Sequence, residues 1–368
     1  HAECLFKQGD IQLKMGDAKA ALIHYSRLLS EYEHYEDVRG LLFDQVLYQT
    51  LRAAILADNL EDATAAAQKI IELYPNGPLT QRSRLLLGQR LVHVDKVSEA
   101  RDVFEDLVEQ FGQFPLRAEV DLALAHAFEQ ESSWTSALTA YELWLETYED
   151  HAERARVEYA LAWVHDRLGN DERALALFQQ FVRVHDQHEF VPLAQNWIAD
   201  YYFNRGKFKE ATTAYSKIAN ELSQSKTAQR QQSILMMAKC QFRLGDFAKV
   251  IAFLAPIKNE FDNSEPADKD FAGEVILCLG DAYFAYARQA KPGSQESVGR
   301  ASAATNAYIA VLSVHRPNRW EAEAWGRSGD LEYYLGEDYP EAIRVYGLAL
   351  GFNEVSISMR SQLEYSLG

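Results

Sequence analysis

The chain has 368 residues, 48% of them hydrophobic and 25% charged, with 9 prolines and 19 glycines, a globular composition that excludes wholesale disorder. Its formal charge of −17 excludes the usual binders of nucleic acids and anionic membranes, because both need a basic surface. The acidic balance favours a basic or neutral partner, or serves solubility alone. Three scattered cysteines do not make a disulfide framework or a zinc site, and we expect Cys240 and Cys278 to be small buried hydrophobes.

The centre of the chain carries a repeat of 37 residues. Small residues recur at this spacing, and each is followed four positions later by an aromatic ring. The pairs are Ala100 and Phe104, Ala137 and Tyr141, Ala174 and Phe178, and Ala211 and Tyr215. A spacing of four places both residues on one face of a helix, one turn apart. Self-similarity at a fixed period of this size predicts a solenoid.

The same pattern extends to both ends of the chain, and it divides the chain into nine units that form a single continuous array over 1–368. Upstream copies contain Ala21 with Tyr25 and Ala63 with Ala67; downstream, Val250 and Leu254 replace the alanine and the ring. The predicted units are 1–40, 41–77, 78–114, 115–151, 152–188, 189–225, 228–265, 271–317 and 320–353, followed by a final helix over 354–368.

Within a unit, an apolar-periodic helix is followed by a short polar turn and a second helix. Leu168-Gly169-Asn170 is such a turn, in which glycine supplies the left-handed conformation that ends a helix. No alternating strand pattern occurs, so the expected fold class is all-α. About a dozen extra residues over 288–303 predict an enlarged turn in the eighth unit. This turn is a tolerated insertion or a functional loop.

The units resemble tetratricopeptide repeats, whose pattern Leu87-Gly88, Gly169, Ala174, Phe178 and Pro75 match. This resemblance implies a right-handed α-α superhelix that binds proteins. The 37-residue spacing is longer than the usual 34, and it resembles the bacterial outer-membrane assembly lipoproteins and the coordinators of the Tol-Pal system. That subgroup implies a role in envelope biogenesis, with a periplasmic or envelope-associated location; a cytoplasmic location is the alternative.

In this family the first helix of each unit lines a concave groove, and the register carries that role onto particular residues here. The implied groove positions are Arg82, Leu85, Gln89, Glu119, Leu122, His126, Arg156, Tyr159, Trp163, Arg167, Asn196, Asp200, Phe203, Leu235, Lys239 and Phe242. Tyr159 and Trp163 stand four apart between two arginines, a composition expected of a binding hot spot. The alternative is that Trp163 is buried between units.

The sequence carries little evidence of catalysis. His185-Asp186-Gln187-His188-Glu189 is the one dense cluster of metal-capable groups, and we expect it to be a solvated link. No phosphate-binding loop or paired nucleophile and base is recognisable, and no apolar run reaches transmembrane length. We therefore expect no metal, no cofactor and no enzyme activity.

The expected function is that of a non-catalytic scaffold, which binds an extended or helical and preferably basic segment of a partner protein in its groove. Two alternatives remain open. One is a structural or oligomerising spacer, and the other is a carbohydrate-binding or enzymatic helical solenoid.

Overall fold

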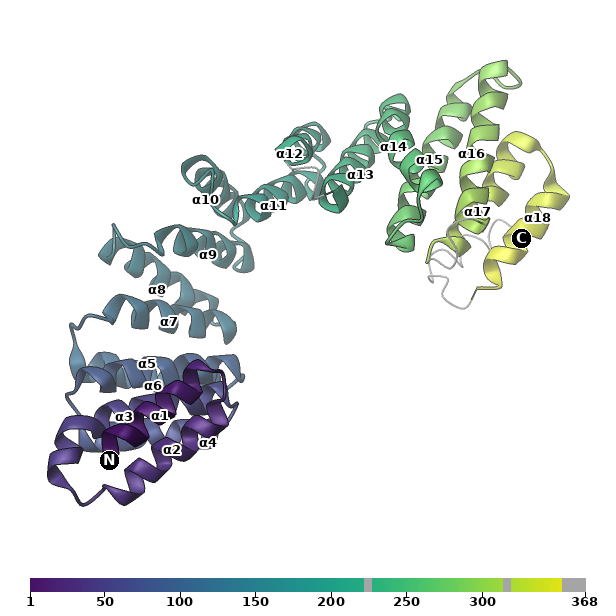
Figure 1. Cartoon of the computed structure of the whole chain (residues 1–368). Helices are drawn as coiled ribbons and strands as arrows, with labels where there is room; N and C mark the ends of the chain where they lie inside the picture. Colours follow the sequence, from purple (N-terminus) through teal and green to yellow (C-terminus); the bar gives the residue numbers. More distant parts are fainter. Residues whose placement is uncertain (222–226, 314–318, 353–368) are drawn as a thin grey trace. The chain divides into compact units, whose positions relative to one another are not determined.

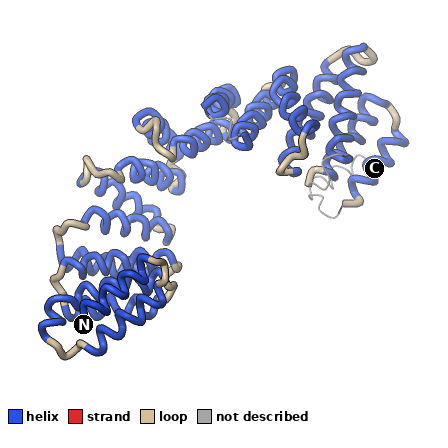
Figure 2. Tube along the Cα trace, viewed as in Figure 1, coloured by secondary structure: helices blue, strands red, loops and turns tan. Residues whose placement is uncertain are grey.

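A computed structural model describes residues 1–221, 227–313 and 319–352, and this part of the chain is helical without strands (Figure 2). The final helix predicted over 354–368 lies outside the described residues. The described α-helices are α1 (Ala2–Lys14), α2 (Ala18–Glu31), α3 (Glu36–Leu56), α4 (Leu60–Leu73), α5 (Pro78–His93), α6 (Val97–Phe111), α7 (Arg117–Gln130), α8 (Trp134–Thr147), α9 (Arg154–Arg167), α10 (Asp171–Val184), α11 (Val191–Asn204), α12 (Phe208–Glu221), α13 (Thr227–Arg243), α14 (Phe247–Asn263), α15 (Lys269–Gln289), α16 (Gln295–Ser313), α17 (Glu321–Leu331) and α18 (Tyr339–Leu350). A short π-helix, η2 (Glu332–Gly336), continues α17.

The chain forms two compact units, 1–181 and 182–368, and the boundary falls within α10. Inside each unit, helices that follow one another in the sequence pack side by side (Figure 1). The first helices of successive pairs also touch: α1 with α3, α3 with α5 and α5 with α7 in the first unit, and α13 with α15 and α15 with α17 in the second. This arrangement, nine helix pairs among the described residues, is the all-α solenoid that the repeat predicts.

The repeated alanines and rings are core residues, as their spacing predicts. Ala100, Ala137, Ala174 and Ala211 are all 0% exposed. Each ring packs across the helix pair onto a small residue of the first helix, sixteen positions earlier in most units. A Cβ atom built on Gly88 would overlap the ring of Phe104, and one on Gly9 would overlap that of Tyr25. Glycine or alanine at this position therefore permits the close approach of the two helices.

The residue that follows this glycine or alanine in the first helix depends on the type of ring it faces. Where the buried ring is a tyrosine, this residue accepts or shares a hydrogen bond of the tyrosine hydroxyl. The pairs are Tyr25 with Asp10 (2.7 Å), Tyr141 with His126 (2.7 Å), Tyr215 with Asp200, Tyr308 with Asp281 (3.0 Å) and Tyr346 with Asp330 (2.8 Å). Where the ring is Phe104 or Phe178, the equivalent residue is Gln89 or Trp163. A buried hydroxyl needs such a partner, and a phenyl ring does not.

Two details of the predicted organisation are wrong. The extra residues over 288–303 do not form an enlarged turn, because α15 runs to Gln289 and α16 begins at Gln295. They lengthen both helices to 21 and 19 residues and leave a short turn in which Gly293 has a φ of +72°. The helix that opens the second predicted unit also begins at Glu36, five residues before the limit set at 41.

Candidate functional site

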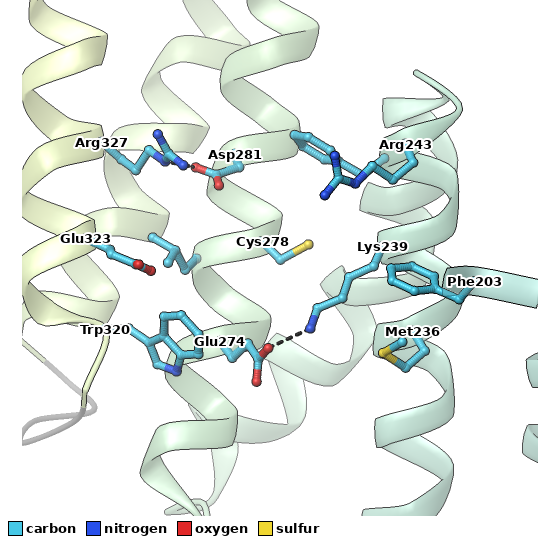
Figure 3. A pocket seen from close by; sticks show the side chains of 12 residues that line it. Phe203, Met236, Lys239, Arg243, Glu274, Cys278, Asp281, Trp320, Glu323 and Arg327 are labelled. Carbon is cyan, nitrogen blue, oxygen red and sulfur yellow. Dashed lines mark hydrogen bonds and ion pairs between the residues drawn. The ribbon is translucent and has the colours of Figure 1, made fainter. Parts of the chain in front are cut away.

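The second unit contains an open cleft of about 600 Å³ formed by its four first helices, α11, α13, α15 and α17 (Figure 3). The lining residues of α13, α15 and α17 include pairs three or four positions apart, which share one helical face, and α11 contributes Phe203 alone. The lining residues are Phe203, Met236, Lys239, Phe242, Arg243, Glu274, Leu277, Cys278, Asp281, Trp320, Glu323 and Arg327. Three aromatic rings, a methionine and the side chains of six acidic and basic residues therefore face the same space.

Ion pairs hold the walls of the cleft together. Lys239 Nζ lies 2.6 Å from Glu274 Oε1 and joins α13 to α15. Arg327 Nε lies 3.2 Å from Asp281 Oδ1 and joins α17 to α15. The indole of Trp320 donates a hydrogen bond of 2.8 Å to the carbonyl of Asp270, which anchors the start of α17. These contacts fix the spacing of the three helices, so the cleft is preformed.

Burial raises the pKa of three groups in the cleft: Asp281, Cys278 and Glu323. Burial raises the pKa of Asp281, and Arg327 and the hydroxyl of Tyr308 offset part of that rise. Burial also raises the pKa of the Cys278 thiol to about 12, so the thiol is protonated and unreactive at neutral pH. The prediction that Cys278 is a buried hydrophobe is wrong in part, because this residue is only half-buried and lines the cleft. Cys240 is buried as expected.

A second cavity of about 300 Å³ lies between α11, α12 and α13 and shares Met236 with the cleft. Its lining is rich in amide and hydroxyl groups, including Asn196, Gln229, Gln232 and Ser233. Side-chain amides both donate and accept hydrogen bonds, which is what an extended polypeptide backbone requires. The two cavities together give an amphipathic track along the first helices of this unit.

Five of the residues predicted to line a groove belong to these cavities. Phe203 and Lys239 line the cleft, and Asn196 and Asp200 line the second cavity. Phe242, which belongs to the same register, also lines the cleft. Leu85 and Leu235 were expected at the groove surface, but they are 9% and 0% exposed because they face the helix behind them.

The residues predicted in the first unit lie on its first helices, and several of them pack within the protein. Tyr159 and Trp163 contact the ring of Phe178 at centroid distances of 5.6 and 5.7 Å, and Arg167 lies 5.6 Å from the Trp163 ring centre. Arg156 pairs with Glu153 at 3.2 Å. These residues are half-buried or exposed and form an aromatic and cationic cluster rather than a cavity.

The remaining predicted residues of this unit are placed in the same way. Arg82 and Gln89 are exposed on α5, and neither lines a cavity described above. His126 is exposed on α7, and its Nδ1 lies 2.7 Å from the Tyr141 hydroxyl, which also donates to Glu129. His126 therefore has a role inside its own unit, as Asp200 has toward Tyr215.

The sequence did not point to the α15 and α17 walls of the cleft. Glu274, Cys278 and Asp281 follow one another on one face of α15, and Trp320, Glu323 and Arg327 do so on α17. The small residue that faces each ring is the sequence signal that could have led to these walls. Asp281 follows Gly280 in the same way that the predicted groove residue Asp200 follows Ala199. The twelve extra residues between Gly280 and Tyr308 hid that correspondence, because the spacing there is 28 instead of 16.

The described residues contain no group of three or more metal-capable side chains, and none of their helices is long and apolar enough to cross a membrane. The histidine-rich segment around His185 lies in the link between α10 and α11, where His188 Nδ1 accepts a hydrogen bond from the backbone N–H of Phe190.

Comparison with known proteins identifies the repeats. One tetratricopeptide-repeat model matches residues 85–152 and 159–225, and a second matches residues 3–34. The solved C-terminal part of a TPR repeat-containing protein from Cytophaga hutchinsonii is 13% identical, with a TM-score of 0.56 over 77% of this chain and 99% of that one. The apo form of RapI is 14% identical, with a TM-score of 0.51 over 95% of this chain and 97% of that one.

No curated protein matches the chain. The structural matches are below one-fifth identity, so they bear on the fold alone. The repeat matches and the structural matches agree with the helix pairs and with the packing of small residues onto rings. The chain therefore contains tetratricopeptide repeats and folds as an α-solenoid of the tetratricopeptide-repeat type.

Proposed function

We propose that the chain is a non-catalytic scaffold that binds an extended or helical segment of a partner protein in the cleft between α11, α13, α15 and α17. One observation carries the proposal: the first helices of four successive repeats bring three aromatic rings, a methionine and six acidic and basic residues to one open, preformed surface. Aromatic and arginine side chains dominate the binding energy of protein interfaces. The adjoining amide-lined cavity extends this surface along the helices, as a polypeptide needs.

Site-specific photocrosslinking tests this proposal. The full chain, with the photoreactive amino acid p-benzoylphenylalanine at Met236 or at Phe242, is expected to crosslink to one partner segment in cells. The matched control places the same group at Val298, which is 60% exposed on α16 and outside the cleft. Mass spectrometry of the crosslink identifies the segment. The corresponding synthetic peptide should bind the purified chain and lose affinity on Phe242→Ala. Equal crosslinking from Val298 contradicts the proposal.

The main rival is carbohydrate binding, because Trp320 and three carboxylates line the same cleft. Two of the carboxylates, Glu274 and Asp281, are engaged with cations of the cleft walls, which leaves fewer acceptors for sugar hydroxyl groups. Saturation-transfer NMR with a mixture of oligosaccharides separates the two functions. Saturation transfer to an oligosaccharide that is seen with the wild type and disappears on Trp320→Ala favours carbohydrate binding. No saturation transfer with the wild type, together with a crosslink to a peptide, favours the scaffold.

A structural or oligomerising spacer is the other rival, and sedimentation velocity at micromolar concentration tests it, because a self-assembling spacer must oligomerise there. We place the scaffold in bacterial envelope biogenesis on the 37-residue spacing alone. Fractionation of the source cells tests that setting, since an envelope protein must be found with the periplasm or the membranes.

A further inference from the structure

The charges that line the cleft differ in how far they are already neutralised. Lys239 and Glu274 form one ion pair, and Arg327 and Asp281 form another. Arg243 on α13 and Glu323 on α17 form no ion pair with any other described residue. Recognition of a charged ligand therefore falls mainly on Arg243 and Glu323, because the other four charges are neutralised within the walls.

Of these two groups, Glu323 is the one that gains more from pairing with a ligand charge. It is half-buried, whereas Arg243 is exposed at the rim of the cleft. Burial raises the pKa of Glu323, and the nearby charges of Arg327 and Arg319 offset only part of that rise. Neither arginine forms an ion pair with Glu323: Arg327 pairs with Asp281, and Arg319 Nη2 lies 3.7 Å from Glu274 Oε2. A partly dehydrated carboxylate without a counter-charge gains more from an incoming cation than a hydrated rim charge does.

We propose that Glu323 is the recognition site for a lysine or arginine side chain of the bound partner segment. The inference rests on the proposed scaffold function, whose partner chemistry it names. Trp320 stands three positions before Glu323 on the same wall and offers an apolar surface to the aliphatic stem of the incoming side chain (Figure 3). Met236 and Phe203 on the opposite side of the cleft accept an apolar neighbour in the segment.

The charge of the whole chain supports a cationic ligand over an anionic one. At −17, the chain attracts basic segments and repels acidic ones during encounter. An acidic segment would have to rely on Arg243, which is solvated at the rim and therefore gains little on pairing. Charge complementarity thus favours a basic residue with an apolar neighbour.

Selection from a random dodecapeptide library displayed on phage tests the inference on the full chain. Three proteins are used in parallel: the wild type, Glu323→Gln, and Glu210→Gln as the control. Glu210 is exposed on α12, outside the cavities described here. Peptides selected on the wild type and on Glu210→Gln are expected to share a lysine or arginine next to an apolar residue. Those selected on Glu323→Gln are expected to lack that preference.

A selected peptide is then synthesised with lysine or glutamine at the shared position, and its affinity is measured by fluorescence anisotropy. We expect Glu323→Gln to weaken the lysine peptide by about tenfold and to leave the glutamine peptide unchanged. A basic preference that persists on Glu323→Gln, or a selection without basic residues, overturns the inference.

The same experiment separates this inference from the scaffold function itself. Peptides that lose binding on Phe242→Ala but show no basic preference overturn the role of Glu323 and leave the peptide-binding cleft standing. Failure to select any peptide that depends on Phe242 counts against the cleft, and the role of Glu323 falls with it. Far-ultraviolet circular dichroism of each variant establishes that the helices are intact.

Discussion

A buried ring and the small residue opposite it form the packing element that most repeats reuse. The ring fills the space that a missing side chain leaves, so the two positions constrain each other: Gly88 with Phe104, and Gly329 with Tyr346. The residue next to the small one is constrained in turn by the ring's hydroxyl, as Asp10 and Asp330 show. These residues explain the regularity of the sequence, and they leave little freedom for binding.

Glycine substitutions test the close approach directly. Gly88→Ala should destabilise the chain by about 1–3 kcal/mol, because the new Cβ overlaps a fully buried ring that cannot move aside. Gly40→Ala is the matched control: it lies in helix α3 with nothing within 4 Å of a built Cβ, so it should stabilise by about 0.5–1 kcal/mol. Urea unfolding followed by circular dichroism measures both. Equal effects at the two sites contradict the packing argument.

The tyrosine and acceptor pairs make a separate prediction. Tyr25→Phe removes a hydroxyl that donates to Asp10 at 2.7 Å and should cost about 1 kcal/mol. Because Asp10 is half-buried and also accepts from Gln49, Asp10→Ala should cost a similar amount, and the double variant less than the sum. A double-mutant cycle by urea unfolding gives the coupling. Strict additivity of the two substitutions shows that the pair does not interact.

The pH dependence of stability reports on Glu323. Its pKa in the folded chain is raised by burial above the ordinary value of 4.5, so between these two values the folded state binds more protons than the unfolded state. Stability contributed by this group is therefore present below pH 4.5 and is lost as the pH rises through the folded pKa. Glu323→Gln, which cannot ionise, should gain stability relative to the wild type between pH 4 and pH 7.

Unfolding midpoints measured at pH 4, 5, 6 and 7 check this sign, with the exposed Glu210→Gln as the reference. Glu274, Asp281, Arg319 and Arg327 surround Glu323 and are present in all three proteins, so their titration cancels in the difference. A stability difference that is constant with pH, or that falls as the pH rises, contradicts the raised pKa.

At the scale of the helices, the regular part of the fold was predictable and the complete site was not. The 37-residue spacing predicts the helix pairs from α5 to α12, and the register implied by the tetratricopeptide-repeat resemblance led to Phe203 and Lys239. It did not lead to Glu274 or Glu323, because the extra residues of α15 and α16 interrupt the regular spacing between Gly280 and Tyr308. Counter-charges are also a property of folded neighbours, so the sequence does not show which carboxylates in the cleft remain unpaired.

The packing of the helix pairs predicts how far the destabilisation caused by a core substitution extends along the chain. Ala137 is 0% exposed where α8 packs on α7, so Ala137→Glu buries a carboxylate without a counter-charge and should cost about 3 kcal/mol or more. Because repeats contact mainly their neighbours, hydrogen exchange should accelerate in α7 to α9, while α13 to α16 keep their protection. Uniform acceleration along the chain shows instead that the two units unfold together.

For the whole molecule, the charge of −17 predicts how salt acts on the proposed interaction. Long-range attraction between an acidic scaffold and a basic segment accelerates association, and salt screens it beyond about 8–10 Å at physiological ionic strength. The contact with the half-buried Glu323 is screened less, because water and ions reach it poorly. Raising sodium chloride from 50 to 500 mM should therefore lower the association rate of the selected lysine peptide several-fold and change its dissociation rate little. Stopped-flow fluorescence resolves the two rates, and a salt effect confined to dissociation places the recognised charge outside the cleft.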